Sequence, residues 1–147
     1  MYSQRWINYF NKIVNVVATN SPCIRRKVGA IIVKDKRILA TGYNGLPSGF
    51  THCSSCFGGK RKSGQKLHVL PCLHAELNCL IQCATHGISC KDADMFVSVF
   101  PCNDCLKAII GAGIKNLYIK SYYALDEEGE NTRSFLLSQA EIEVTLI

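Results

Sequence analysis

The chain has 147 residues, of which 48% are hydrophobic and 19% are charged. This composition excludes a wholly disordered chain and a collagen-like one, and the length suits a single domain. No stretch approaches about eighteen apolar residues, and the N-terminus lacks a basic region followed by an apolar run, so we expect neither a transmembrane helix nor a signal peptide. The 17 basic residues exceed the 11 acidic ones, and the net charge of +6 weakly favours anionic partners such as phosphorylated small molecules or nucleic acid.

The N-terminal half is predicted to hold a helix, a hairpin and a long irregular segment. Apolar side chains recur at three- and four-residue steps over 4–19, which is typical of one face of an amphipathic helix. The β-branched segment 28–33 and the segment 37–43 flank a short polar turn and predict a β-hairpin. The periodicity is lost over 44–73, and a loop of about thirty residues is uncommon in a compact domain unless something ties it down.

Helices and strands alternate through the rest of the chain. We expect helices over 74–85, 101–112 and 126–140 (the last regular from about Asn131), and strands over 95–100, 116–123 and 141–147. The order α-β-β-α-β-α-β-α-β indicates an α/β fold, with a five-stranded sheet layered between helices. The hairpin should add an antiparallel element to an otherwise parallel sheet. We find no repeat or linker, so one domain is expected to span 1–147.

Nine cysteines are the most unusual feature of the composition. Their odd number and the missing export signal argue against a disulfide scaffold. In the reducing cytoplasm, where we expect this protein, cysteines at short spacings are more often metal ligands or catalytic groups.

Two short motifs each open a predicted helix: His74-Ala-Glu76 and Pro101-Cys102-x-x-Cys105. Helical residues two apart point to nearly opposite sides, so His74 and Glu76 can share a pocket only at a helix end. Cys102 and Cys105 are three apart and lie on one face. Both helices follow strands, so we expect both N-termini at the same edge of the sheet, where open α/β folds place their sites.

One histidine and two thiolates leave zinc with an open fourth position, which is the catalytic arrangement. Glu76 would not be a ligand; it would accept a proton from the activated water and pass it to the substrate base. A lone Cys-x-x-Cys is often a redox motif or half of a structural zinc site, and a lone His-x-Glu carries little information. The two motifs together are the signature of zinc-dependent nucleobase deaminases.

With these residues in place, the chain resembles the cytidine deaminase superfamily and, more closely, the deoxycytidylate (dCMP) deaminases. The resemblance runs from Cys23 to the last strand, and its most discriminating segment is Gly42-Tyr-Asn-Gly-Leu-Pro-Ser-Gly49. It implies a cytidine-deaminase-like three-layer α/β/α sandwich and hydrolysis of dCMP to dUMP and ammonia, which feeds thymidylate synthesis. It also implies a homohexamer that dCTP activates and dTTP inhibits. Whether dCTP is itself a substrate stays open.

The same resemblance implies roles for further residues beside the zinc ligands and Glu76. Asn44 would hydrogen-bond the deoxyribose, and Tyr123, at the end of the fourth strand, would line the nucleotide pocket. Arg26 and Lys27 are candidates for the phosphate, since a guanidinium suits a phosphate well. The plainer alternatives are a solvated basic turn at Arg26 and Lys27, and a packed aromatic at Tyr123.

A second group of possible ligands occupies the irregular segment. The spacing Cys53-x2-Cys56-x11-His68-x3-Cys72 by itself resembles a closed zinc site. Relatives with a second, structural zinc favour Cys23, Cys53, His68 and Cys72 instead, which leaves Cys56 spare. A zinc ion with four ligands would explain how the long loop is ordered; otherwise several of these residues are isolated thiols.

If the resemblance extends to regulation, dCTP and dTTP, with Mg²⁺ as a possible companion, would bind the glycine-rich segment 42–49. The basic side chains of the neighbouring loop would assist, namely Lys60, Arg61, Lys62 and Lys66. A tight turn beside a solvated loop is the alternative.

Two other functions remain to be weighed. A nucleic-acid deaminase of the tRNA adenosine type shares both motifs, but the segment 42–45 and the end of this chain at its last strand argue against it. A non-catalytic zinc-binding module would have no need of Glu76. We therefore expect a nucleotide substrate, with neither nucleic acid nor membrane as a partner.

Overall fold

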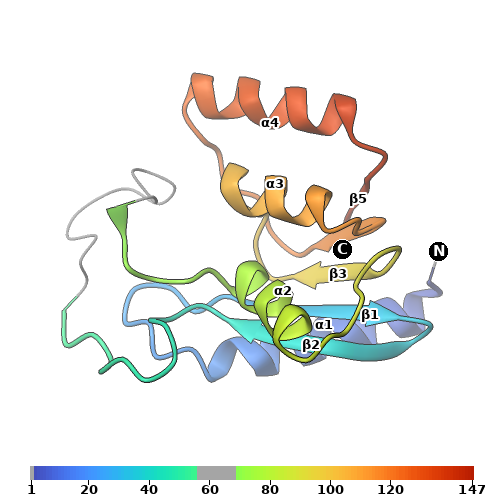
Figure 1. The fold of residues 1–147 in the computed structure, drawn as a ribbon. Coiled ribbons are helices and arrows are strands. Elements are labelled where there is room, and N and C mark those ends of the chain that lie inside the picture. Colours follow the sequence, from blue (N-terminus) through green and yellow to red (C-terminus); the bar gives the residue numbers. More distant parts are fainter. Residues whose placement is uncertain (1, 56–68) are drawn as a thin grey trace.

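The computed structural model describes residues 2–55 and 69–147. These residues form four helices and five strands (Figure 1). In chain order they are α1 (Gln4–Thr19), β1 (Gly29–Lys34), β2 (Arg37–Tyr43), α2 (Ala75–Thr85), β3 (Asp94–Val97), α3 (Asn103–Gly111), β4 (Asn116–Ile119), α4 (Glu127–Gln139) and β5 (Glu143–Leu146). None of these helices is long and apolar enough to cross a membrane.

The strands form one mixed sheet in the order β2-β1-β3-β4-β5. Strand β1 is antiparallel to both of its neighbours, whereas β3, β4 and β5 are parallel to one another. The expected mixed sheet is therefore confirmed. Because β2 and β3 are both antiparallel to β1, they run in the same direction, and their carboxyl ends lie at the same edge of the sheet.

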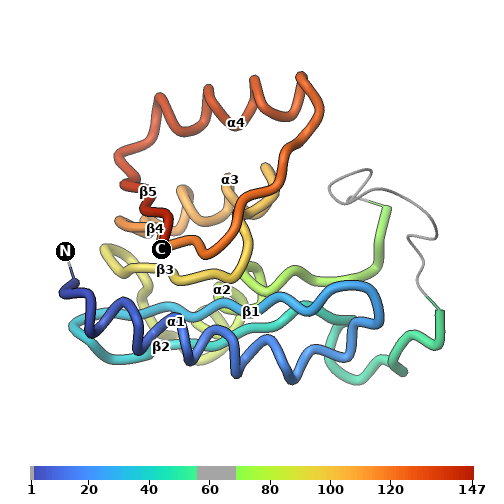
Figure 2. The backbone as a smooth tube through the Cα atoms, turned by 180° about the vertical axis from the view of Figure 1, so that it is seen from behind, coloured from blue at the N-terminus to red at the C-terminus, as the bar shows by residue number. Residues whose placement is uncertain are grey.

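Helices cover both faces of the sheet. Alternate residues of β1 point to opposite faces, as strand geometry requires, so Ile31 and Val33 pack with Phe10 and Val14 of α1. The other face packs against α2 and α3, with α4 lying against α3. Figure 2 shows α1 in front of the sheet, α2 and α3 behind it, and α4 above α3. The three-layer α/β/α arrangement expected from the sequence is thus confirmed.

Two helices approach the sheet closely because glycines face them. A Cβ placed on Gly42 of β2 would lie 2.3 Å from the carbonyl oxygen of Ala75. A Cβ on Gly29 of β1 would lie 2.4 Å from the carbonyl oxygen of Val14 in α1. Any larger side chain would collide with helix backbone at either place. Gly42 therefore allows the first turn of α2 to lie directly on β2.

Three predicted boundaries were wrong by more than two residues. Strands β3 and β4 end at Val97 and Ile119, and beyond them the chain continues as loops, so Tyr123 is not a strand-end residue. Helix α4 begins at Glu127 rather than near Asn131. An aspartate N-cap explains the early start, since Asp126 Oδ1 accepts a hydrogen bond from the Gly129 amide at 2.9 Å.

Candidate active site

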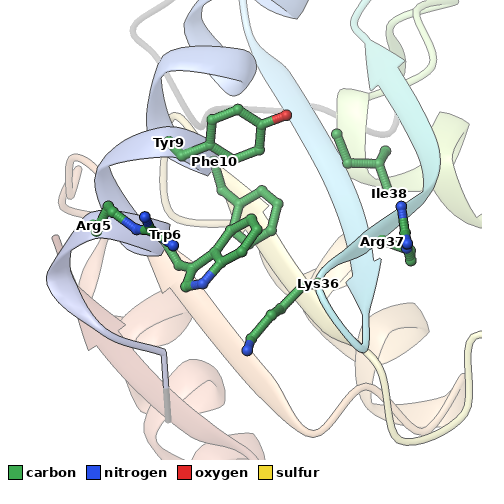
Figure 3. A pocket seen from close by; sticks show the side chains of 7 residues that line it. All are labelled: Arg5, Trp6, Tyr9, Phe10, Lys36, Arg37 and Ile38. Atoms are coloured by element: carbon green, nitrogen blue, oxygen red, sulfur yellow. The ribbon is translucent and has the colours of Figure 1, made fainter.

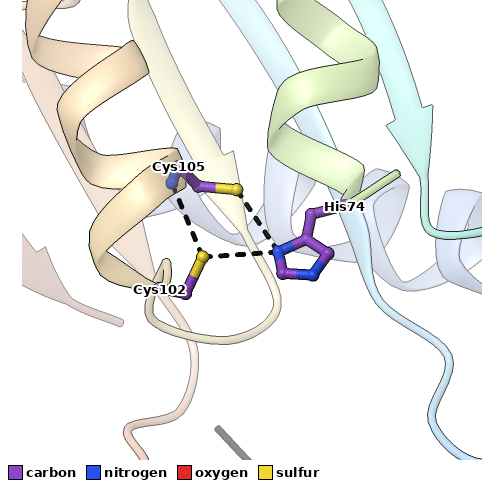
Figure 4. A group of neighbouring side chains, drawn as sticks. All are labelled: His74, Cys102 and Cys105. Carbon is purple, nitrogen blue, oxygen red and sulfur yellow. Dashed lines mark hydrogen bonds between the residues drawn. The ribbon is translucent and has the colours of Figure 1, made fainter. Parts of the chain in front are cut away.

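Two helix N-termini meet at the edge of the sheet where β2 and β3 end. His74 is the N-cap residue of α2, and Cys102 is the N-cap residue of α3. Glu76 and Cys105 follow in the first turns of these helices. First-turn side chains gather around the helix axis. Figure 4 shows the side chains of His74, Cys102 and Cys105 turned toward one another across the two helix starts.

The separations of the three ligand atoms suit a tetrahedral zinc ion. His74 Nδ1 lies 3.4 Å from the sulfur of Cys102 and 3.4 Å from the sulfur of Cys105. Zinc bonds of about 2.0 Å to nitrogen and 2.3 Å to sulfur, at a tetrahedral angle, put such atoms roughly 3.5 Å apart. Within residues 2–55 and 69–147, no other group of three or more His, Cys, Asp or Glu side chains converges in this way. The donor set therefore fits zinc with one position open.

Local electrostatics favour the thiolate form at Cys102, whereas the hydrogen bond to Cys102 and burial raise the pKa of the Cys105 thiol. A hydrogen bond from Cys105 and the neighbouring His74 lower the pKa of the Cys102 thiol to about 4. The hydrogen bond to Cys102 raises the pKa of His74 in turn. Without metal, the protons shared in this cluster balance the thiolate charge, and a bound zinc ion would take their place.

Glu76 is a buried acid beside this cluster. Only 4% of the residue is exposed, and burial raises the pKa of its carboxyl group from 4.5 to about 7. Neither of the two ion pairs found in the described residues involves Glu76. Burying a carboxyl group without an ion-pair partner is costly. A pKa near neutrality is, however, what a general acid–base requires.

Asn44 lies just after β2 and holds the chain that enters β1. Its Oδ1 accepts hydrogen bonds from the Val28 amide at 2.8 Å and the Ser21 hydroxyl at 2.8 Å. Its Nδ2 donates to the carbonyl oxygen of Arg26 at 2.8 Å. The family resemblance implied only a contact between Asn44 and the deoxyribose. The structure adds an anchoring role, which fixes the segment carrying Arg26 and Lys27.

Arg26 lies beside Tyr123, whereas Lys27 contacts the end of α1. The guanidinium carbon of the exposed Arg26 lies 5.9 Å from the centre of the Tyr123 ring. Lys27 is also exposed, and its Nζ donates to the carbonyl oxygen of Thr19 at the end of α1. Burial raises the pKa of Tyr123, and the nearby charges of Cys102 and Glu76 raise it further. Arg26 and Tyr123 therefore adjoin one another. Tyr123 is also within electrostatic range of His74, Cys102 and Cys105, which we call the zinc cluster.

The proposed second set of ligands is only partly described. His68 and Cys56 lie outside the described residues, as do Lys60, Arg61, Lys62 and Lys66. The described cysteines of the set, Cys23, Cys53 and Cys72, do not converge as His74, Cys102 and Cys105 do.

Two of these cysteines, Cys23 and Cys72, lie beside a point where separate segments of the chain meet. We call this point the corner, and it consists of Pro22, Gly45 and Leu73. Gly45 pairs with Leu73 through two backbone hydrogen bonds of 3.1 and 2.8 Å. A Cβ on Gly45 would lie 3.2 Å from Pro22. Cys23 and Cys72 each lie one residue from this corner.

Sequence reasoning gave Arg133 no role, yet the structure leaves only 2% of it exposed. It lies on α4 against Tyr122 and Tyr123. No signal in the sequence distinguishes Arg133 from a solvated arginine, because α4 carries few apolar residues.

A surface hollow of about 490 Å³ lies elsewhere, between α1 and the turn that joins β1 to β2 (Figure 3). Its lining consists of Arg5, Trp6, Tyr9, Phe10, Lys36, Arg37 and Ile38. None of the described candidate site residues lines it, and the turn lies at the opposite end of β2 from the zinc cluster. The hollow is therefore separate from the candidate active site.

Known proteins resemble this chain over most of its length. Residues 4–121 match the family described as the cytidine and deoxycytidylate deaminase zinc-binding region. The ComE operon protein 2 of Bacillus subtilis is 37% identical over 142 residues, which are 95% of this chain and 69% of that protein. The deoxycytidylate deaminase of Saccharomyces cerevisiae is 34% identical over 128 residues, or 84% of this chain but only 40% of the yeast protein.

Among solved structures, the dCMP deaminase of cyanophage S-TIM5 in complex with dCMP and dUMP is similar with a TM-score of 0.81. It is 32% identical, and the match covers 100% of both chains. The matched region includes both zinc motifs and the helix starts that carry them. This chain therefore belongs to the cytidine and deoxycytidylate deaminase family of zinc-binding domains.

Proposed function

We propose that this protein deaminates dCMP, consuming water and producing dUMP and ammonia. One observation carries the proposal: three zinc-ligand atoms converge at two helix starts, beside the buried carboxyl group of Glu76. A structural zinc site has no need of such a group. The similarity to a phage dCMP deaminase that binds dCMP and dUMP supports this choice of substrate.

In this mechanism His74, Cys102 and Cys105 hold the zinc ion. When bound, the ion supplies a Lewis acid that makes a water nucleophilic near neutral pH. The Glu76 carboxylate accepts the proton of that water and delivers it to ring nitrogen N3 as the C4–O bond forms. It then carries the second proton of the water to the amino group, which leaves as ammonia when the C4–N bond breaks. Two protons and one oxygen thus move from water to products, and Glu76 returns to its starting state.

The nucleotide would lie between the zinc cluster and the segment that Asn44 anchors. An amide NH₂ has two hydrogens, so Asn44 can bond the carbonyl of Arg26 and still offer one to a sugar hydroxyl. The exposed guanidinium of Arg26 would pair with the phosphate, with Lys27 near by in the chain. The Tyr123 ring, which adjoins Arg26 and the zinc cluster, would form a wall of the pocket.

Further properties belong to the same proposal. We propose a second, structural zinc ion held by Cys23, Cys53, His68 and Cys72, supported by the shared corner that Cys23 and Cys72 flank. The family resemblance supports the remaining proposals. They are regulation by dCTP and dTTP, a role for Mg²⁺ with those nucleotides, assembly as a homohexamer, and a role in the cytoplasm as a supplier of dUMP. Rate curves against dCMP, with and without each triphosphate, test the regulation.

Ammonia release from dCMP, dCTP, deoxycytidine and a tRNA hairpin, measured side by side with the zinc-loaded protein, tests the main proposal. We expect turnover of dCMP well above that of deoxycytidine and of the hairpin, because the phosphate is recognised. Turnover of dCTP reports whether the pocket admits a triphosphate. Deamination of the hairpin with none of dCMP would refute the proposal.

A further inference from the structure

Arg133 of α4 is a buried cation with an unusual environment. The described residues include three buried polar or charged side chains, namely Ser21, Glu76 and Arg133. Ser21 bonds Asn44, and Glu76 belongs to the candidate active site. Arg133 has neither explanation, and a buried cation destabilises a protein unless it is paired and hydrogen-bonded.

Only one corner of the guanidinium group is paired. Its Nη1 donates to both carboxylate oxygens of Glu130, at 3.0 and 3.2 Å, to the Tyr122 hydroxyl, and to the Tyr123 carbonyl at 3.3 Å. Both Nε and Nη2 are buried and have no hydrogen-bond partner among the described residues. Unsatisfied buried donors cost stability, so hydrogen bonding alone does not account for this placement.

Aromatic rings enclose the group instead. The guanidinium carbon lies 4.4 Å from the ring centre of Phe100, 4.7 Å from that of Tyr122 and 5.5 Å from that of Tyr123. These distances are within the range of cation–π attraction, which strengthens when the cation is desolvated. Arg133 is therefore held to the Tyr122–Tyr123 segment by cation–π attraction as well as by hydrogen bonds.

These rings link Arg133 to both sides of the active site. Phe100 lies two residues before the zinc ligand Cys102, and its amide donates to the carbonyl of Ser121 at 2.8 Å. Tyr123 adjoins Arg26 on the side where the nucleotide is proposed to bind. The guanidinium group thus ties the chain that enters the zinc cluster to the loop after β4 that carries Tyr123.

We propose that Arg133 is a positioning residue, which holds the Tyr123 ring in place and thereby sets the affinity of the pocket for its nucleotide. The inference rests on the proposed function, since it assigns the affected site to nucleotide binding. Arg133 touches none of the reacting groups. Its loss should therefore change substrate binding far more than the chemical step.

A double-mutant cycle tests this coupling, with Arg133→Met, Tyr123→Leu and the double variant. Methionine keeps an unbranched chain and removes the charge and the planar group. We expect Arg133→Met to raise KM for dCMP about tenfold with kcat changed less than about threefold and zinc content unchanged. In the Tyr123→Leu background the same substitution should change KM less than about twofold, because its effect acts through the ring.

The matched control is Lys107→Met. Lys107 pairs with Asp104 three residues before it, as Arg133 pairs with Glu130, but the Lys107 side chain is 57% exposed. Its loss should leave KM unchanged. All variants are assayed well below their melting temperatures; if Arg133→Met does not fold, Arg133→Lys takes its place, because a lysine keeps the charge but cannot stack on three rings.

Hydrogen exchange gives a readout that needs no turnover. We expect faster amide exchange over residues 121–125 in Arg133→Met, with β4 unchanged, and no difference in Lys107→Met. Unchanged exchange over 121–125 would overturn the inference even if the wild-type protein proved inactive on dCMP. If the wild type is active, two further results would overturn the inference. One is a KM for dCMP that does not change in Arg133→Met, and the other is additive effects of Arg133→Met and Tyr123→Leu on KM. An inactive wild type with faster exchange in the variant refutes the dCMP assignment alone.

Discussion

Replacing Glu76 with glutamine should abolish most activity and at the same time stabilise the metal-free protein. Glutamine keeps the shape of the side chain but carries no charge and accepts no proton. General acid–base catalysis is worth about 10² to 10⁴ in rate, so kcat for dCMP should fall by that factor. Zinc content should not change, because Glu76 is not a ligand. His74→Ala, by contrast, should lose the zinc ion of the active site.

The stability gain follows from the burial of the carboxyl group. Its pKa is 4.5 when unfolded and about 7 in the folded, metal-free chain. Below pH 4.5 the group is protonated in both states and costs nothing; above about 7 the folded state must carry a buried charge. A pKa raised from 4.5 to about 7 corresponds to roughly 3 kcal/mol of destabilisation at pH 8, as an upper bound.

Urea unfolding of the metal-stripped proteins at pH 8 and pH 5 measures this effect. Glu76→Gln should be more stable than the wild type at pH 8, and the difference should shrink at pH 5. A glutamine variant with kcat within about tenfold of the wild type would refute Glu76 as the proton carrier. A variant no more stable at pH 8 than at pH 5, relative to the wild type, would refute the buried-charge argument.

Three further predictions concern the frame of the site. Asn44→Ala should destabilise the fold by about 1–3 kcal/mol in urea unfolding, because it removes the side-chain partners of the Val28 amide and the Arg26 carbonyl. Gly42→Ala should lower both Tm and zinc content, because its Cβ would meet α2 backbone at 2.3 Å. In Gly111→Ala the new Cβ meets nothing within 4 Å, so Tm should hold or rise. Elemental analysis should find two zinc ions per chain.

Local patterns predicted most of the architecture correctly. The apolar repeat of 4–19 reproduces the bounds of α1, and the hairpin prediction reproduces β2. The helix starts were predictable from the two motifs. Each motif places a possible metal ligand, His74 or Cys102, directly before a helix and a second polar side chain in its first turn. Few other arrangements of these residues would form a metal site. Strand direction then brought the two starts to one edge, since β2 and β3 are both antiparallel to β1.

Features that depend on tertiary contacts were not predictable. The ends of β3 and β4 are set by pairing with neighbours, and Phe100 and Ser121 still hydrogen-bond beyond the last strand residues. Arg133 occurs on a helix whose sequence indicates a solvated surface. The packing of α4 against the loops after β3 and β4 buries it. The sequence of one helix does not show which aromatic rings other segments of the chain place against it.

The ligands of the proposed second zinc ion can be chosen only by combining the sequence spacing with the structure. Spacing alone could not choose between Cys23 and Cys56 as the fourth ligand. The Gly45–Leu73 pairing and the approach of Gly45 to Pro22 bring the neighbours of Cys23 and Cys72 to one corner, which favours Cys23. His74→Ala should then retain one zinc ion of two, and Cys23→Ser should retain the other. Cys23→Ser should also lower Tm, because a structural zinc site contributes to the free energy of folding. One zinc ion in the wild type, or two in Cys23→Ser, would contradict this assignment.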